Sequence, residues 1–331
     1  MVAQNGRLSP DDKEDQVIRP SKLDEFTGQS DIKENLKIAM EAAKGRGEPI
    51  DHTLFAGMPG LGKTTLANII SKEMEVNIHS TIGSLLKKPK DVVGFLTPIK
   101  EGDVLFIDEI HRINPVVEEV FYTAMEDGFI DVMVGENKNA RSVKLNIDPF
   151  TLIGATTKQG LLSAPFRDRF GIIATLNPYT QEDLITITKR SASIMKIGIS
   201  DGGADEIANR SRGTPRIVNR LLRRVRDYTF VKNEQIITQE LAAQALDKLK
   251  IDKMGLDETD RKILSMLVND YNGRPVGLKT IAITIGEDIR TIEDVYEPYL
   301  IQMGFLKRTH LGREITSNGK TYMRMDTNGG D

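Results

Sequence analysis

One short segment constrains this chain more than any other: Gly57-Met58-Pro59-Gly60-Leu61-Gly62-Lys63-Thr64, which fits the pattern GxxxxGK[ST]. The apolar run before it, residues 52–56, predicts a short buried strand, and a helix is expected from Lys63 to Glu73. The three glycines allow turn conformations that are closed to residues with a side chain. Backbone N–H groups and the positive end of the helix dipole then converge on a phosphate. The segment therefore predicts a phosphate loop, in which Lys63 reaches the β- and γ-phosphates and the Thr64 hydroxyl ligates Mg²⁺.

Two acids follow a second apolar run, residues 104–107, at the carboxyl end of a predicted strand. In an α/β sheet this edge is where ligands bind. We expect Asp108 to hold the magnesium ion and Glu109 to polarise an attacking water as a general base. The pair thus predicts hydrolysis of a nucleoside triphosphate.

A third predicted strand, residues 150–155, ends in Thr156 and Thr157 and is followed by Arg167-Asp168-Arg169. An arginine can neutralise the charge that develops on a transferring phosphoryl group, either in its own subunit or in a neighbour. The alternative is an ordinary Arg–Asp surface pair at a helix end.

Composition bounds the remaining possibilities. The chain has 331 residues, 39% hydrophobic and 28% charged, which fits a soluble protein of two or three domains. A net charge of −3 confines any nucleic-acid contact to local patches, and the lack of cysteine excludes disulfides and thiolate metal sites. No long apolar run and no signal peptide is visible, so we expect a cytoplasmic protein without membrane contact.

Strands alternate with helices over the first half of the chain, which predicts an α/β fold with a parallel sheet covered by helices on both faces. Residues 130–135 and 141–147 alternate around a Gly/Asn-rich stretch and predict an inserted β-hairpin. Such a hairpin can carry a partner contact or be a plain insertion. We expect a loose tail at 1–16 and a nucleotide-binding core at 17–178.

The second half reads as helical, with a lid domain expected at 179–253 and a winged-helix domain at 254–331. Pro215 suits a first helical turn, which would place Arg216 near the nucleotide. In the last domain, three helices precede a small hairpin whose wing carries Arg308 and Arg313. These basic residues favour contact with a phosphate backbone, the alternative being a basic hairpin in a protein-interaction module. Asn318-Gly319 predicts a turn before a frayed end.

The order of these motifs resembles the RuvB family of bacterial Holliday-junction branch-migration ATPases, which are AAA+ proteins. The resemblance runs from about residue 19 to residue 319. Its most specific carriers are the phosphate loop, Asp108-Glu109-Ile110-His111, Gly213-Thr214-Pro215-Arg216 and Tyr296-Glu297-Pro298-Tyr299-Leu300.

The resemblance implies a homohexameric ring that translocates double-stranded DNA through a Holliday junction held by RuvA, with RuvC as a further partner, in recombination, DNA repair and the SOS response. By position, Thr157 matches a γ-phosphate sensor, Arg169 an arginine finger offered to the adjacent subunit, and Arg216 a second sensor. It also implies a wider nucleotide site, made of Ile18, Arg19, Gly57, Gly60, Leu61, Gly62, Lys63, Thr64, Thr65, Tyr179, Pro215 and Arg216. Val143 and Leu145 fall in the hairpin that matches the RuvA contact, and Arg308 and Arg313 match the DNA-contacting wing.

Residues 82–92 depart from the family pattern, which usually has a Ser-Gly-Pro turn there; this chain has Ile82-Gly83-Ser84. Met58 also replaces a usual proline. Two other functions are consistent with the same core: a clamp-loader-like ATPase, and a nucleotide-switched winged-helix regulator of DNA. The winged helix argues against the first, and Glu109 with Arg169 against the second.

Overall fold

The computed structural model describes residues 17–134 and 141–328, so the predicted tail at 1–16 lies outside the described residues. The chain divides into two compact units. Among the described residues, the first unit extends to Met195 and includes Gly213–Asn219, and the second comprises Lys196–Arg212 and the chain from Arg220 onward. No described helix is long and apolar enough to cross a membrane.

The first unit is built on a five-stranded sheet in the order β2-β3-β6-β1-β7, and every neighbouring pair is parallel. This confirms the predicted parallel sheet. Its strands are β1 Thr53–Ala56, β2 Ile78–Ile82, β3 Val104–Asp108, β6 Thr151–Thr156 and β7 Ile172–Thr175. The short edge strand β7 was not predicted, because its apolar run, Ile172-Ile173-Ala174, has only three residues.

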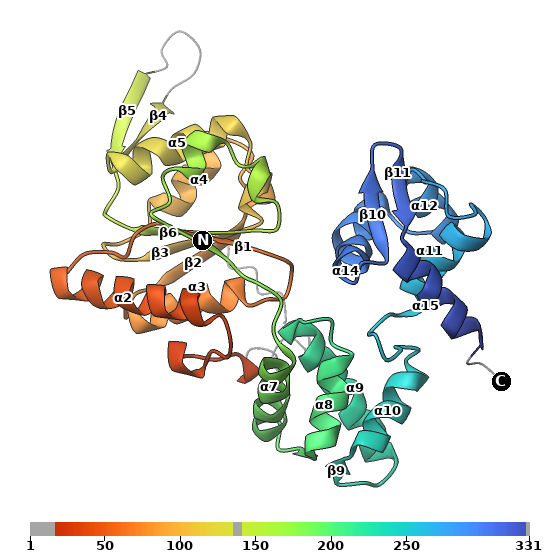
Figure 1. Cartoon of the computed structure of the whole chain (residues 1–331). Helices are drawn as coiled ribbons and strands as arrows, with labels where there is room; N and C mark the ends of the chain where they lie inside the picture. The colour runs from red at the N-terminus through yellow and green to blue at the C-terminus, as the bar shows by residue number, and fades with distance from the viewer. Residues whose placement is uncertain (1–16, 135–140, 329–331) are drawn as a thin grey trace. The chain divides into compact units, whose positions relative to one another are not determined.

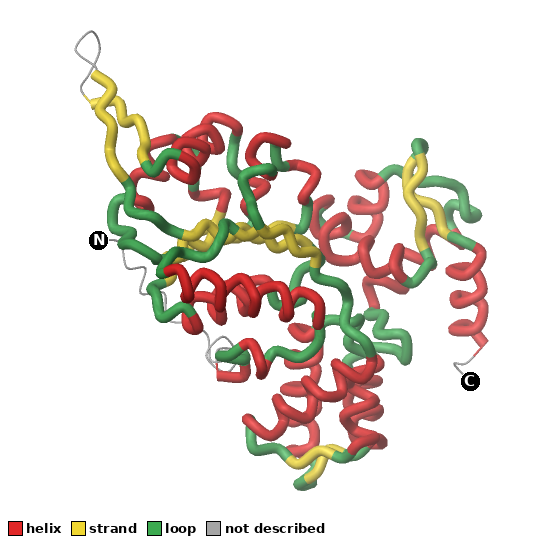
Figure 2. Tube along the Cα trace, turned by 60° about the vertical axis from the view of Figure 1, so that its left-hand side comes forward, coloured by secondary structure: helices red, strands yellow, loops and turns green. Residues whose placement is uncertain are grey.

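Helices cover both faces of this sheet, as the sequence predicts (Figures 1 and 2). One face packs on α2 Ser30–Arg46 and α3 Lys63–Glu73, the other on α4 Pro89–Leu96 and α5 Pro115–Glu126. The core on the second side joins sheet residues such as Leu105 and Leu152 to Val92 of α4 and Phe121 of α5, all with no exposed area. This unit also contains the short α6 Ala164–Arg167 and α7 Gln181–Ile194.

The predicted insertion is an antiparallel hairpin of β4 Phe129–Val134 and β5 Arg141–Asn146. It projects beyond the helices that cover the sheet (Figure 1). Val143 is half exposed, whereas Leu145 packs against the core of the unit. The two hairpin residues therefore differ: Val143 is available to a partner, and Leu145 partly anchors the hairpin.

The second unit begins with a helical region of α8 Asp201–Asn209, α9 Pro215–Val231 and α10 Gln239–Lys248, with α9 entering it at Arg220. Two short parallel strands, β8 Gly198–Ile199 and β9 Ile236–Ile237, were not predicted, because two residues carry no periodicity. Arg212 ties this region to the next helix: its guanidinium donates to Asp257 and Asp260 at 3.1 and 2.6 Å.

The predicted winged helix follows, with α11 Glu258–Asn269, α12 Leu278–Ile285, α13 Ile289–Thr291, a π-helical turn Ile292–Tyr296, α14 Glu297–Gln302, and a wing of β10 Leu306–Thr309 paired with β11 Gly312–Ile315. The prediction at Asn318-Gly319 is wrong: these residues lie in α15 Ser317–Asn328. Thr316 caps this helix by accepting from the Gly319 N–H at 3.1 Å. A Cβ at Gly319 would lie 2.6 Å from the Phe305 carbonyl oxygen, so the glycine serves close packing rather than a turn.

Candidate nucleotide site

The phosphate loop lies between β1 and α3, as the motif predicts. Gly60 has φ +81° and Gly62 has φ +107°, backbone conformations that favour glycine. Space restricts them further: a Cβ on Gly60 would come within 2.9 Å of the Arg216 Cβ, and one on Gly62 within 2.9 Å of the Phe26 ring. The glycines thus allow both the turn and the close approach of the surrounding segments.

Lys63 is the first residue of α3 and is buried. Its Nζ donates to the carbonyl oxygens of Gly57 and Met58 at 2.7 and 2.8 Å, within the loop that it would serve. Burial lowers the pKa of the Lys63 ammonium to about 8; Asp108 acts in the opposite direction and Arg216 adds to the lowering. A polyanion beside this group would favour its charged form.

The two acids lie at the end of β3, where the strand emerges from the sheet. Asp108 Oδ1 accepts from the Glu109 N–H at 2.9 Å, and Glu109 pairs with Arg112 at 3.0 Å. Glu109 has φ +49°, a left-handed conformation that costs energy for a residue with a side chain. Strained backbone of this kind concentrates at functional sites.

Gly83, in the segment that departs from the family pattern, accommodates this strained turn. A Cβ at Gly83 would lie 2.4 Å from the Glu109 carbonyl oxygen. The lack of a side chain at Gly83 therefore leaves room for the Glu109 backbone.

The end of β6 lies beside these acids in the sheet. Thr156 Oγ1 accepts from the Lys158 N–H at 2.9 Å and is 3.0 Å from Nδ1 of His111. This contact joins the turn after Glu109 to the end of β6, which Thr157 follows directly. The predicted phosphate sensor and the predicted base therefore lie on connected segments.

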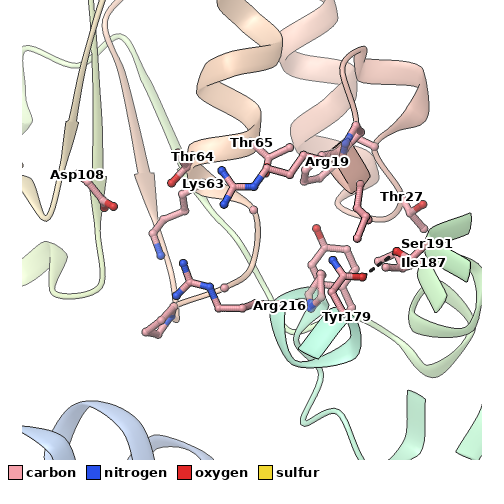
Figure 3. Close-up of a pocket in the computed structure, with 18 of the residues that line it drawn as sticks. Arg19, Thr27, Lys63, Thr64, Thr65, Asp108, Tyr179, Ile187, Ser191 and Arg216 are labelled. Carbon is pink, nitrogen blue, oxygen red and sulfur yellow. Dashed lines mark hydrogen bonds between the residues drawn. The ribbon is translucent and has the colours of Figure 1, made fainter. Parts of the chain in front are cut away.

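These residues surround a single cavity of about 300 Å³ (Figure 3). Most of the predicted site lines it: Ile18, Arg19, Gly60, Gly62, Lys63, Thr64, Thr65, Asp108, Glu109, Thr157, Tyr179, Pro215 and Arg216. Gly57 and Leu61 belong to the loop but do not line the cavity. The Leu61 carbonyl instead accepts from the Tyr179 hydroxyl at 3.0 Å, and burial raises the pKa of that phenol.

The donor set fits magnesium bound together with a triphosphate. Thr64 and Asp108 supply a hydroxyl and a carboxylate oxygen to the same cavity. Among the described residues no cluster of three or more His, Asp or Glu forms a metal cage. Mg²⁺ is typically held by one or two protein oxygens plus phosphates and water, so this sparse set is the kind that it uses.

The cavity has further lining residues that were not named as site residues. Pro59 belongs to the phosphate loop, and Pro20 directly follows the predicted Ile18 and Arg19. The others are Glu25, Phe26, Thr27, Ile82, Thr156, Ile187, Arg190, Ser191 and Asn219. Arg190 of α7 donates to the Ile18 carbonyl at 2.6 Å and so fixes the segment near the start of the described chain. Helical spacing could have found Asn219, since it lies three and four residues after Arg216 and Pro215.

Arg169 is not in the cavity. Its guanidinium donates to the Pro165 carbonyl at 2.6 Å and to Glu126 at 3.0 Å, and it lies 4.2 Å above the ring of Tyr122. Tyr122 is in turn 2.9 Å from Ser163, the residue that caps α6. The structure thus holds Arg169 outside the cavity of its own chain.

The two wing arginines meet at one buried carboxylate. Arg308 donates from Nε to Glu297 at 2.5 Å, and Arg313 donates to both oxygens of Glu297 at 3.1 Å. The Arg308 side chain is 54% exposed and that of Arg313 18%. Arg308 therefore keeps more of its guanidinium open to an anion, whereas Arg313 also holds the wing to α14.

Comparison with known proteins covers nearly the whole chain. Residues 18–176 match the family model described as the Holliday junction DNA helicase RuvB P-loop domain, residues 179–252 the RuvB AAA lid domain, and residues 253–324 the RuvB C-terminal winged helix domain.

Similar proteins include Holliday junction branch migration complex subunits RuvB from two organisms. The one from Methanoregula boonei is 59% identical, covering 96% of this chain and 95% of the relative. The one from Oleidesulfovibrio alaskensis is 53% identical, covering 94% and 97%. A solved structure of the RuvB Holliday junction branch migration motor of Thermotoga maritima is 49% identical with a TM-score of 0.84, covering 93% of this chain and 99% of that one.

Proposed function

Since the chain belongs to the RuvB family of P-loop ATPases, we propose that it hydrolyses ATP to translocate double-stranded DNA during branch migration of Holliday junctions. The observation that carries this proposal is the single cavity shared by Lys63, Asp108, Glu109 and Arg216. It brings a phosphate loop, a candidate metal ligand, a candidate base and a cation to one place.

Each group has a proposed part in the reaction. Lys63 and the loop amides bind the phosphates, and Glu109 orients water and accepts its proton. Thr64 and Asp108 would hold Mg²⁺, which when bound neutralises phosphate charge. Thr157 and Arg216 would respond to the γ-phosphate from the sheet and from α9, which continues into the second unit.

Arg169 acts in this proposal on the neighbouring subunit. Its separation from the cavity of its own subunit supports action in trans, because an arginine finger must reach the γ-phosphate. The functional unit would then be a ring, and we propose a homohexamer. On assembly, Arg169 would leave its ion pair with Glu126 and contact the triphosphate bound by the neighbouring subunit.

The partners follow the same reasoning. The exposed wing residue Arg308 suits the DNA backbone. The projecting β4–β5 hairpin with its exposed Val143 suits RuvA, and RuvC is proposed from family membership alone. Both relatives are described as subunits of a branch migration complex.

The test is ATP turnover by the purified protein with and without double-stranded DNA, together with its mass in solution with ATP. DNA-stimulated turnover by a ring supports the motor. Glu109→Gln should still bind ATP yet stall as an assembled ring. Nucleotide binding by a monomer without turnover, even with DNA and RuvA present, would instead favour a nucleotide-switched regulator.

A further inference from the structure

Two helix faces form the end of the cavity away from the phosphate loop. Ile187 and Ser191 line it from α7, one turn apart, and Asn219 lines it from the second turn of α9. Figure 3 shows Ile187 and Ser191 on the opposite side of the cavity from Asp108 and Thr64. A nucleotide with its phosphates on the loop would therefore place its base between these helices.

A hydrogen bond fixes the polar group at this end. Ser191 is buried, with 1% of its surface exposed, and its hydroxyl donates to Oδ1 of Asn219 at 2.8 Å (dashed line in Figure 3). The carbonyl side of the amide is thus occupied. An amide nitrogen has two N–H donors, and the structure gives Nδ2 of Asn219 no acceptor within the described residues. The Asn219 side chain therefore offers a ligand the N–H donors of Nδ2.

Ring nitrogens of a purine are acceptors, and a base that presents none at this point would leave the donors unpaired at a cost. We propose that Asn219 is a specificity-determining residue that donates from Nδ2 to a ring nitrogen of the adenine base, and that Ser191 is the positioning residue that fixes its amide. This inference rests on the proposed function, since it assumes that the phosphate loop holds a nucleotide.

The experiment compares ligands with and without a base. Dissociation constants are measured by calorimetry for ATP, inorganic tripolyphosphate and three ATP analogues in which N1, N3 or N7 is replaced by C–H. The proteins are wild type, Asn219→Ala, the isosteric Asn219→Asp, Ser191→Ala and Lys63→Ala. Asn269→Ala is the matched control, because Asn269 also pairs its amide with a serine hydroxyl, at 3.0 Å on the exposed face of α11.

We expect Asn219→Ala and Asn219→Asp to weaken ATP binding about tenfold and to leave tripolyphosphate binding unchanged. One of the three analogues lacks the ring nitrogen that accepts from Asn219. Wild type should bind that analogue about as weakly as the Asn219 variants bind ATP. The Asn219 variants should bind that analogue and ATP with equal affinity. Ser191→Ala should reduce the same discrimination in part, and Asn269→Ala should behave as wild type.

Unchanged ATP affinity in both Asn219 variants overturns the inference, as does equal weakening of ATP and tripolyphosphate. If the Asn219 variants weaken the binding of all three analogues by the same factor, the inference is also overturned, because no single ring nitrogen then accepts from Asn219. Failure of the proposed function looks different: Lys63→Ala would then bind ATP and tripolyphosphate as well as wild type does.

Discussion

ATP binding should take up protons at mildly alkaline pH, because Lys63 is partly neutral in the ligand-free protein. Its pKa is about 8, lowered chiefly by burial. A bound triphosphate favours the charged ammonium and raises that pKa. At pH 8 about half of the ligand-free molecules lack the proton, so binding should take up about 0.5 proton, rising to about 0.9 at pH 9.

The sign of the effect on affinity follows from the same linkage. The contribution of Lys63 is complete below pH 8 and is lost as pH rises from there toward the higher pKa of the complex. Affinity should fall by up to about tenfold per pH unit in that window. The γ-phosphate does not interfere, because a phosphate monoester with a second pKa near about 6 is already ionised.

The assay is calorimetry at pH 8 and pH 9 in two buffers with different ionisation enthalpies, which gives the protons taken up. Lys63→Arg is the control, because a guanidinium stays charged across this range and should abolish the uptake. Asp108→Asn removes the negative charge that raises the pKa of Lys63. The pKa of Lys63 should then fall further, and proton uptake on ATP binding should begin at lower pH. Equal uptake in wild type and Lys63→Arg, or none in wild type at pH 9, would refute the reasoning.

Three further outcomes follow from the structure. Arg169→Ala should bind ATP normally but lose about 10³-fold or more in turnover. Mixing this variant with Lys63→Ala should restore activity. If Arg169→Ala alone turns over ATP as fast as wild type, Arg169 takes no part in the reaction. Gly83→Ala places a Cβ against the carbonyl oxygen of Glu109, the predicted base. Turnover should therefore fall more than ATP affinity. An equal loss of turnover and affinity would point to general unfolding instead. Arg308→Ala should reduce the slope of DNA affinity against salt by about one and should change the melting temperature little, because it removes one hydrogen bond to Glu297 from a half-exposed side chain. Arg313→Ala removes two of the three arginine hydrogen bonds to this buried carboxylate, so it should lower both the slope and the melting temperature. An Arg308→Ala slope equal to wild type would exclude that contact.

The sequence by itself determined the elements whose signal is local. A phosphate loop is a contiguous stretch of backbone, so glycine positions and the following helix are sufficient to predict it. Alternation of strands and helices predicted the parallel sheet, and the hairpin and the winged helix followed from short-range patterns. These predictions are confirmed by the observed sheet order and strand pairing.

Only the tertiary structure decided which distant side chains meet. Ser191 and Asn219 are 28 positions apart and belong to no motif, yet they form one wall of the cavity. The contact of Arg169 with Glu126, 43 positions away, is equally invisible in the sequence. Such pairs depend on how whole helices pack, and packing is set by the summed burial of many residues rather than by any local pattern. The sequence was therefore sufficient to predict the chemistry of the site. Only the fold showed which other side chains line the cavity and that Arg169 lies outside it.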